Sequence, residues 1–225
     1  MQAIHSSPRL DVTARRNGLA TGWTSPTRRS RTMPLEDESY FRAIPWCRKY
    51  LDDPRYVRVG GLTRRSASDT YDTLIAKTLK TPDTIPAVMS FERLQPPPSQ
   101  QQKHQKQQQQ REDGKGTPVA VRETVTLFAL GSGVNGHDNT AHGGTVATIL
   151  DEAAGLMGGR LLPFVTASLH VDYVRPLRTP QVVQVRARAA VTQGRKKTVS
   201  LQVCDQHDNV LAMGEGLFVR VKELL

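Results

Sequence analysis

The sequence predicts an α+β fold in which a curved antiparallel sheet wraps one long central helix. Two patterns predict this class. Several C-terminal segments alternate between apolar and polar residues, which is typical of half-buried strands. Residues 146–157 instead repeat their apolar side chains at helical spacing and end before a Gly-Gly pair. A single apolar helix beside such strands is best buried when the sheet curves around it.

The positive charge of the chain lies largely outside the predicted core. The 225 residues hold 31 Lys and Arg against 21 Asp and Glu, and a net charge of +10 suggests a polyanionic partner. Residues 1–34, however, hold six Arg and one Asp, whereas residues 118–225 hold eleven basic and nine acidic residues. A nucleic-acid-binding core is therefore not expected.

Residues 1–34 are predicted to form a disordered basic leader. They are rich in Arg, Ser and Thr and nearly free of acid, which is the composition of an organelle transit peptide. Prolines and glycines interrupt any amphipathic helix, so a plain disordered tail explains the segment equally well. Both a mitochondrial and a cytoplasmic location are therefore expected alternatives.

The cysteines and the hydropathy pattern restrict the class of protein further. Cys47 and Cys204 form neither a disulfide framework nor a CxxC motif, so we expect a reducing compartment and no metal site. No stretch reaches 18 consecutive apolar residues, so we expect no membrane span.

Residues 35–84 predict an N-terminal helical extension. Segments 39–51 and 70–79 show short helical patterns, and the second has three apolar residues on one face. Both helices are expected to cover a larger body, because so few scattered apolar residues make a weak core. That larger body is the main domain, predicted at 85–225.

A low-complexity segment interrupts the main domain. Residues 95–117 are rich in Gln, Pro and Lys and offer no apolar cluster to bury, so a disordered insertion is expected. The flanking segments, 85–94 and 118–130, have strand-like composition. The insertion is therefore predicted to join the two strands of a hairpin.

Four later strands are predicted to form an antiparallel meander, because short turn-like links separate them. In the first, the odd residues are apolar, so Thr166, Ser168 and His170 are expected to share the opposite face. The four strands are expected at 165–173, 183–191, 199–203 and 211–221.

The start of the predicted helix offers a site for negative charge. Gly143 and Gly144 let a ligand approach the free N–H groups of the first helical turn, which is an oxyanion hole in outline. Asp151 lies at the edge of the apolar stripe, where a half-buried carboxylate can act as base or nucleophile. The alternative is an ordinary surface pair, Asp151 with Glu152.

The spacing of these groups has a consequence for assembly. Gly143 and Asp151 lie eight residues apart, about 12 Å along a helix, yet both must approach one reacting carbonyl. One helix cannot satisfy this requirement. Two antiparallel copies can, so the catalytic interpretation predicts a homodimer with sites at the subunit interface.

These residues resemble the hotdog-fold acyl-CoA thioesterases, in the branch that contains thioesterase superfamily member 4 and the phenylacetate-pathway thioesterase. The resemblance covers about residues 118–225 well and residues 70–94 loosely, as the family's leading helix and first strand. Its motifs are the His142-Gly143-Gly144 triplet with Asp151 after six further residues, then Val165 to Leu169, Asp172-Tyr173, Arg175-Pro176 and Gly194-Arg195-Lys196.

The resemblance implies catalytic roles for Asn135, in the loop before the triplet, and for five further residues. Gly143 would supply the N–H that binds the developing oxyanion, with His142 shaping the loop and Gly144 opening the helix. Asp151 would attack the thioester carbonyl or activate a water molecule. Thr166 would hold that water or the carboxylate.

The resemblance also implies substrate contacts. Coenzyme A would contact Asp172 and Val174 in the strand and Arg195 and Lys196 in the hairpin turn, with Val174 acting through its backbone only. The basic turn can alternatively be an ordinary solvated turn. Asn135, in the loop before the triplet, would orient the substrate carbonyl.

The predicted activity is hydrolysis of acyl-CoA to a free acid and coenzyme A, without a cofactor, by a homodimer or a dimer of dimers. One alternative is a hotdog dehydratase acting on enoyl or hydroxyacyl thioesters, although no Asp/His pair with suitable spacing stands out. A non-catalytic acyl-CoA-binding protein is the alternative from another class.

Overall fold

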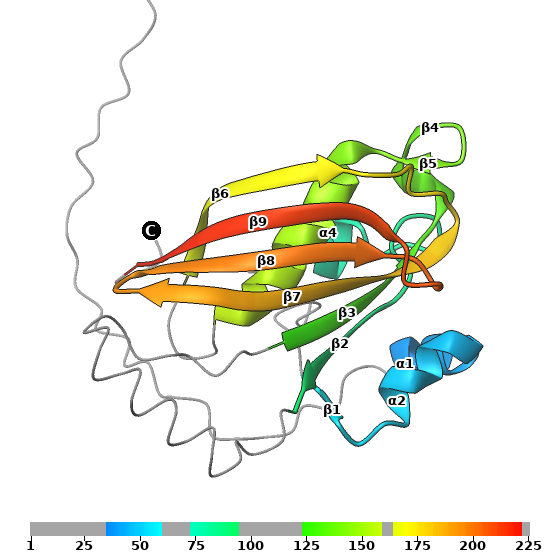
Figure 1. Ribbon diagram of the computed structural model, residues 1–225. Coiled ribbons are helices and arrows are strands. Elements are labelled where there is room, and N and C mark those ends of the chain that lie inside the picture. The colour runs from blue at the N-terminus through cyan, green and yellow to red at the C-terminus, as the bar shows by residue number, and fades with distance from the viewer. Residues whose placement is uncertain (1–34, 60–72, 95–122, 159–163, 222–225) are drawn as a thin grey trace, which may run out of the picture. The chain divides into compact units, whose positions relative to one another are not determined.

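A computed structural model describes residues 35–59, 73–94, 123–158 and 164–221. Within them, a seven-stranded antiparallel sheet has the order β1-β2-β3-β7-β8-β9-β6 (Figure 1). The strands are β1 Tyr56–Arg58, β2 Val88–Arg93, β3 Glu123–Leu130, β6 Phe164–Tyr173, β7 Gln181–Gln193, β8 Lys196–Cys204 and β9 Val210–Arg220. A small hairpin, β4 Asn135–His137 with β5 Thr140–Ala141, precedes the main helix.

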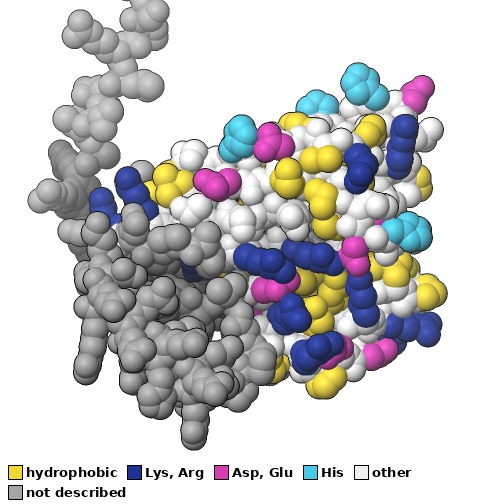
Figure 2. Space-filling model, viewed as in Figure 1, with side chains coloured by type: hydrophobic (Ala, Val, Ile, Leu, Met, Phe, Trp, Pro, Cys, Tyr) yellow, Lys and Arg dark blue, Asp and Glu magenta, His cyan; other side chains and the backbone are white. Residues whose placement is uncertain are grey.

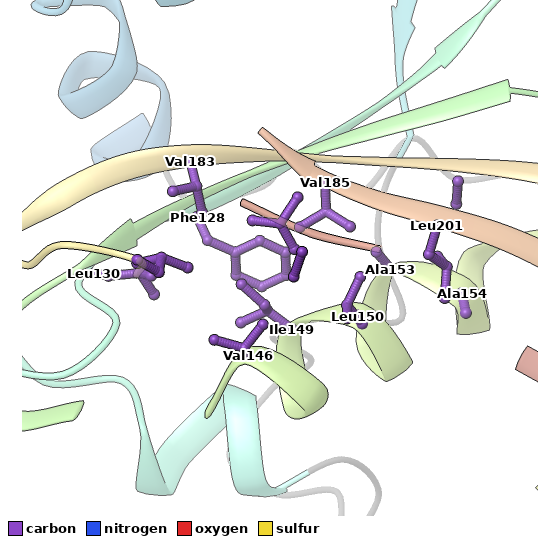
Figure 3. Packing of buried hydrophobic residues seen from close by; sticks show 14 of the residues in the cluster. Phe128, Leu130, Val146, Ile149, Leu150, Ala153, Ala154, Val183, Val185 and Leu201 are labelled. Atoms are coloured by element: carbon purple, nitrogen blue, oxygen red, sulfur yellow. The ribbon is translucent and has the colours of Figure 1, made fainter. Parts of the chain in front are cut away.

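The long helix α4, Gly143–Gly155, packs across one face of the sheet and continues into a short 3-10 turn, η4 Leu156–Gly158. The predicted apolar stripe from Val146 to Met157 is buried. Figure 3 shows Ile149 and Leu150 of α4 turned toward Phe128 of β3 and Val185 of β7. A helix enclosed by a curved antiparallel sheet is the hotdog arrangement, so the predicted fold class is confirmed.

The predicted meander of four strands is wrong in one respect. Strands β7, β8 and β9 follow one another in the sheet, but β6 pairs with β9 at the far edge. The physical reason is that a strand has two edges, and β3 occupies the second edge of β7 over eight residue pairs. Residues 174–180 therefore lead from the edge strand β6 past β9 and β8 to β7 in the interior of the sheet.

The outer face of the sheet carries a second apolar cluster. Helices α1, Leu35–Arg42, and α2, Arg48–Leu51, cover β2 and β3, with Phe41 and Tyr50 buried there. Burial raises the pKa of Tyr50 to about 12, so its hydroxyl stays protonated and donates to the buried Gln184 side chain. Residues 41–51 therefore pack against the sheet.

Both predicted N-terminal helices differ from the structure. The segment 39–51 is interrupted, with a 3-10 turn, η1 Pro45–Cys47, between α1 and α2, because proline lacks an N–H and disfavours a helical residue before it. In the segment 70–79, the described part forms one π-helical turn, η2 Leu74–Thr78. There Ile75 and Leu79 pack on the main core as predicted, but Leu74 is 50% exposed and does not share their face.

Other predictions concern the connections. Strands β2 and β3 pair from Val88–Phe128 to Arg93–Glu123, as the predicted hairpin requires. The predicted leader, 1–34, and the insertion, 95–117, lie outside the described residues. Among the described helices, none has the length and apolar character needed to cross a membrane.

Candidate active site

The first turn of α4 is ordered by its own N-cap. His142 adopts an extended backbone (φ −62°, ψ 139°), and its Nδ1 accepts a hydrogen bond of 2.9 Å from the Gly144 N–H. The His142 carbonyl accepts from Thr145 and Val146. Gly136 makes room for this residue, because a Cβ there would lie 2.9 Å from the His142 Cα. His142 is therefore the N-cap of α4.

The N-cap leaves the Gly143 N–H at the start of α4 without a hydrogen-bond acceptor in the described part of the chain. The Gly144 N–H is occupied by His142, whereas no acceptor within the described ranges receives the Gly143 N–H. A helix cannot satisfy its first N–H groups internally. Of the two glycines, Gly143 is thus the one whose N–H remains available to a ligand.

Asp151 occupies the half-buried edge of α4 expected from the helical pattern. The Thr166 hydroxyl donates to its Oδ1 over 2.7 Å. This contact joins helix and strand and fixes one carboxylate oxygen, while the second oxygen keeps its lone pairs for a water molecule or a carbonyl. The arrangement suits a general base or a nucleophile.

Thr166 does not lie on the face of β6 that strict alternation predicts. Thr166 pairs with Phe218, yet Ser168 pairs with Leu217, so Ala167 is a β-bulge. A bulge adds one unpaired residue and shifts the alternation beyond it. Thr166 therefore faces α4, where it bonds Asp151. Beyond the bulge Leu169 and Val171 pack on the core, so Ser168 and His170 lie on the opposite face. The prediction that these three residues share one face is wrong for this reason.

The structure brings the candidate catalytic residues together in two groups rather than one. His142, Gly143 and Gly144 form the first group at the start of α4, and Asp151 with Thr166 forms the second. Gly143 of the first group and Asp151 of the second lie eight residues apart on one helix, a distance of about 12 Å. A single chain therefore does not place an oxyanion donor and a carboxylate around one carbonyl.

The four candidate coenzyme A contacts also form two separate groups, one at each end of β6. Asp172 and Val174 lie at the end of β6 near Gly143, and Asp172 contacts His170 at 3.3 Å. Arg195 lies in the turn between β7 and β8, and Lys196 is the first residue of β8 rather than part of the turn as predicted. The Arg195 carbonyl accepts from the N–H of Arg220, whose strand partner Phe164 begins β6 at its other end. Ten residues of strand, about 30 Å, separate the two ends.

These four residues are exposed in the chain. Figure 2 shows the outward face of the sheet, on which basic and acidic side chains are interspersed. The turn containing Arg195 is held by the positive φ of Gly194 (57°), a conformation that glycine adopts without strain.

Asn135 lies beside the helix start but is already engaged. Its backbone pairs with Ala141, the residue before His142, and its side-chain oxygen accepts from the Thr179 hydroxyl. The amide N–H groups of Asn135 are the side-chain donors through which it could orient a carbonyl.

Tyr173 is a site residue that the sequence patterns missed. Its hydroxyl donates to the Gly143 carbonyl over 3.0 Å, although the residue is 58% exposed. The alternation in β6 indicated only an apolar strand position. The polar end of a tyrosine at the end of that strand was the one available signal.

No group of three or more His, Cys, Asp or Glu side chains in the described part of the chain is arranged to hold a metal ion.

Comparisons with known proteins agree with the motif. Residues 138–212 match the model of the Thioesterase superfamily. Acyl-coenzyme A thioesterase THEM4 of Rattus norvegicus is 31% identical over 103 residues, 45% of each chain. The Bos taurus protein of the same name is 28% identical over 181 residues, 77% of this chain and 70% of its own. The resemblance inferred from the sequence is thereby confirmed.

The chain spans about half the length of the first curated relatives that it matches. Among solved structures, a Bacillus halodurans protein crystallised with CoA is 31% identical, with a TM-score of 0.40. The match covers 43% of this chain and 66% of that one.

Proposed function

We propose that this chain, which carries a thioesterase superfamily domain at residues 138–212, hydrolyses acyl-CoA thioesters to a free acid and coenzyme A. One observation carries the proposal. The helix that leaves the Gly143 N–H available at its start also presents a carboxylate, Asp151, bonded to the Thr166 hydroxyl. An oxyanion donor and an activated oxygen are the two groups that acyl transfer needs.

Two routes use these groups. In the first, Asp151 accepts a proton from water, the resulting hydroxide adds to the thioester carbonyl, and the tetrahedral intermediate expels the thiolate of coenzyme A. In the second, the carboxylate adds directly, expels the thiolate and forms an acyl anhydride that water then hydrolyses. In both, the Gly143 N–H stabilises the negative charge on the carbonyl oxygen, and Thr166 holds the carboxylate in place.

A homodimer through β6 would assemble complete sites. Strand β6 ends the sheet, so one of its edges lacks a partner strand within the described residues. Large apolar side chains lie exposed along it and just beyond it, at Val165, Tyr173 and Val174. Exposed strand edges are ready templates for pairing. An antiparallel second copy would place the Gly143 end of one subunit beside Asp151 of the other.

The same pairing would also unite the coenzyme A contacts. Asp172 and Val174 lie at the Gly143 end of β6, whereas Arg195 and Lys196 lie at the opposite end. Antiparallel copies would bring one pair from each subunit to each site. The two cations would then face the phosphates of coenzyme A, which charge-assisted hydrogen bonds recognise well.

The outer face of the sheet favours a dimer over a dimer of dimers stacked on β2 and β3. Helices α1 and α2 of the same chain cover these strands, with Phe41 and Tyr50 packed against Met89, Phe91 and Leu127. A second dimer would have to displace this buried apolar cluster.

A panel of acyl-CoA substrates with short, medium, long and aromatic acyl groups tests the proposed activity. Released thiol is measured with a chromogenic reagent, and we expect turnover of at least one class by the full chain. Binding of acyl-CoA in calorimetry without release of thiol would identify a binding protein instead. Hydration of an enoyl-CoA without hydrolysis would identify a dehydratase.

Mixed dimers test whether the two halves of each site come from different subunits. A Gly143→Pro chain and an Asp151→Asn chain, carrying different affinity tags, are co-expressed, and the doubly tagged dimer is isolated. Each single variant should be nearly inactive, but the mixed dimer should regain about half the wild-type activity, since one of its two shared sites is intact.

The reciprocal pair is the control. A wild-type chain paired with a chain carrying both substitutions should be nearly inactive if the sites are shared, because each site then contains one altered residue. If Gly143 and Asp151 of the same subunit act together, this dimer keeps half the activity and the first dimer has none. That result would reject the shared site.

A further inference from the structure

The peptide group between Gly143 and Gly144 is held on both of its polar atoms. Its carbonyl, from Gly143, accepts the Tyr173 hydroxyl at 3.0 Å, and its N–H, from Gly144, donates to His142 Nδ1 at 2.9 Å. Because a peptide group is planar, two bonds on opposite sides fix the orientation of the whole plane. One bond comes from the helix cap and the other from a distant strand.

These two hydrogen bonds, called the clamp below, restrain the Gly143 N–H, which is the donor of the candidate oxyanion hole. The Gly143 N–H belongs to the preceding peptide and has no helical partner. Two successive glycines allow the backbone an unusually wide choice of dihedral angles, so the N–H direction is weakly determined by the chain itself. Fixing the next peptide plane removes part of that freedom and keeps the Gly143 N–H directed outward from the helix start.

The contact with Tyr173 requires close approach. A Cβ added at Gly143 would lie 3.3 Å from the Tyr173 hydroxyl oxygen, so the glycine lets the phenol approach the backbone. Tyr173 is positioned in turn by its pairing with Ala212 in β9. It lies between Asp172 and Val174, the two candidate coenzyme A contacts of the strand.

We propose that Tyr173 is a positioning residue that holds the Gly143 N–H in the orientation needed to bind the oxyanion. The proposal rests on the proposed thioesterase function and assigns Tyr173 no contact with the reacting atoms. Since an oxyanion exists only in the transition state and the intermediate, the loss of Tyr173's hydroxyl should affect kcat more than KM.

The test compares Tyr173→Phe with wild type. The variant loses one hydroxyl and keeps the ring, and Tyr40→Phe, an exposed phenol in α1, is the matched control. We expect kcat to fall about tenfold, the effect of losing one well-formed hydrogen bond, with KM nearly unchanged. Affinity for S-trifluoroacetonyl-CoA, whose ketone forms a tetrahedral adduct, should fall by the same factor. Affinity for free coenzyme A should not.

Equal loss of affinity for coenzyme A and for the ketone would overturn the proposal, because Tyr173 would then be a substrate contact. Unchanged kcat and ketone affinity would overturn it as well. A readout without substrate is the amide resonance of Gly143 in ¹⁵N-glycine-labelled protein, which should shift in Tyr173→Phe and not in Tyr40→Phe. If no acyl-CoA is hydrolysed, the proposed function fails, and this resonance still decides whether the clamp orients the amide.

Discussion

Replacing Asp151 with asparagine is expected to lower kcat for the preferred acyl-CoA by about 10²- to 10⁴-fold, the usual contribution of a positioned acid or base. Asparagine has nearly the same shape and can still accept the hydrogen bond from the Thr166 hydroxyl, which donates to Oδ1 in the wild type. It can neither accept a proton from water nor attack a carbonyl. KM should change little, because the carboxylate acts on the reacting centre.

The matched control is Glu152→Gln, which removes the neighbouring carboxylate of the same helix. Its kcat should stay within about twofold of wild type, an effect on the scale of a surface substitution. Steady-state rates of the two variants test whether Asp151 is catalytic. Thermal unfolding confirms that each variant is folded. If Asp151→Asn keeps most of its kcat, or if both variants lose it equally, Asp151 is an ordinary surface residue.

Replacing Gly143 with proline is expected to lower kcat by about 10²- to 10³-fold, the cost of losing one oxyanion donor. Gly143 is the first residue of α4, where proline is well tolerated because the N–H has no helical partner. His142 already has the extended backbone that a following proline requires. The substitution therefore removes the donor while preserving the helix start.

Gly143→Ala separates the donor from the size of the residue. Alanine adds a Cβ but keeps the N–H, and the nearest atom it meets is the hydroxyl of the exposed Tyr173 side chain, at 3.3 Å. That side chain can move by a few tenths of an ångström. The kcat of Gly143→Ala should fall by less than about tenfold, well short of the loss from a missing donor. Equal losses in the alanine and proline variants would show that crowding, rather than the N–H, is responsible.

The local patterns predicted the helix of the site well. The apolar spacing from Val146 to Met157 defines a buried stripe, and the same spacing places Asp151 at its edge. Such periodicities depend only on the geometry of one element, so they can be read without knowing its neighbours. The pairing of β2 with β3 could likewise be inferred from the two segments that flank the insertion.

The strand after the helix was harder to predict. Its alternation identified β6 correctly but gave the wrong face for Thr166, because the bulge at Ala167 depends on the register with β9. The position of β6 at the sheet edge depends on β3 occupying the free edge of β7. Neither cause lies within the strand itself.

The sequence by itself determined the fold class, the central helix and the spacing that separates Gly143 from Asp151. Only the tertiary structure decided that the Thr166 hydroxyl bonds Asp151 and that Tyr173 bonds the Gly143 carbonyl. It also decided that His142 occupies the Gly144 N–H. The physical reason is that periodicity fixes which side of an element is apolar, whereas the contacts of a polar group depend on register, bulges and the strand that packs beside it.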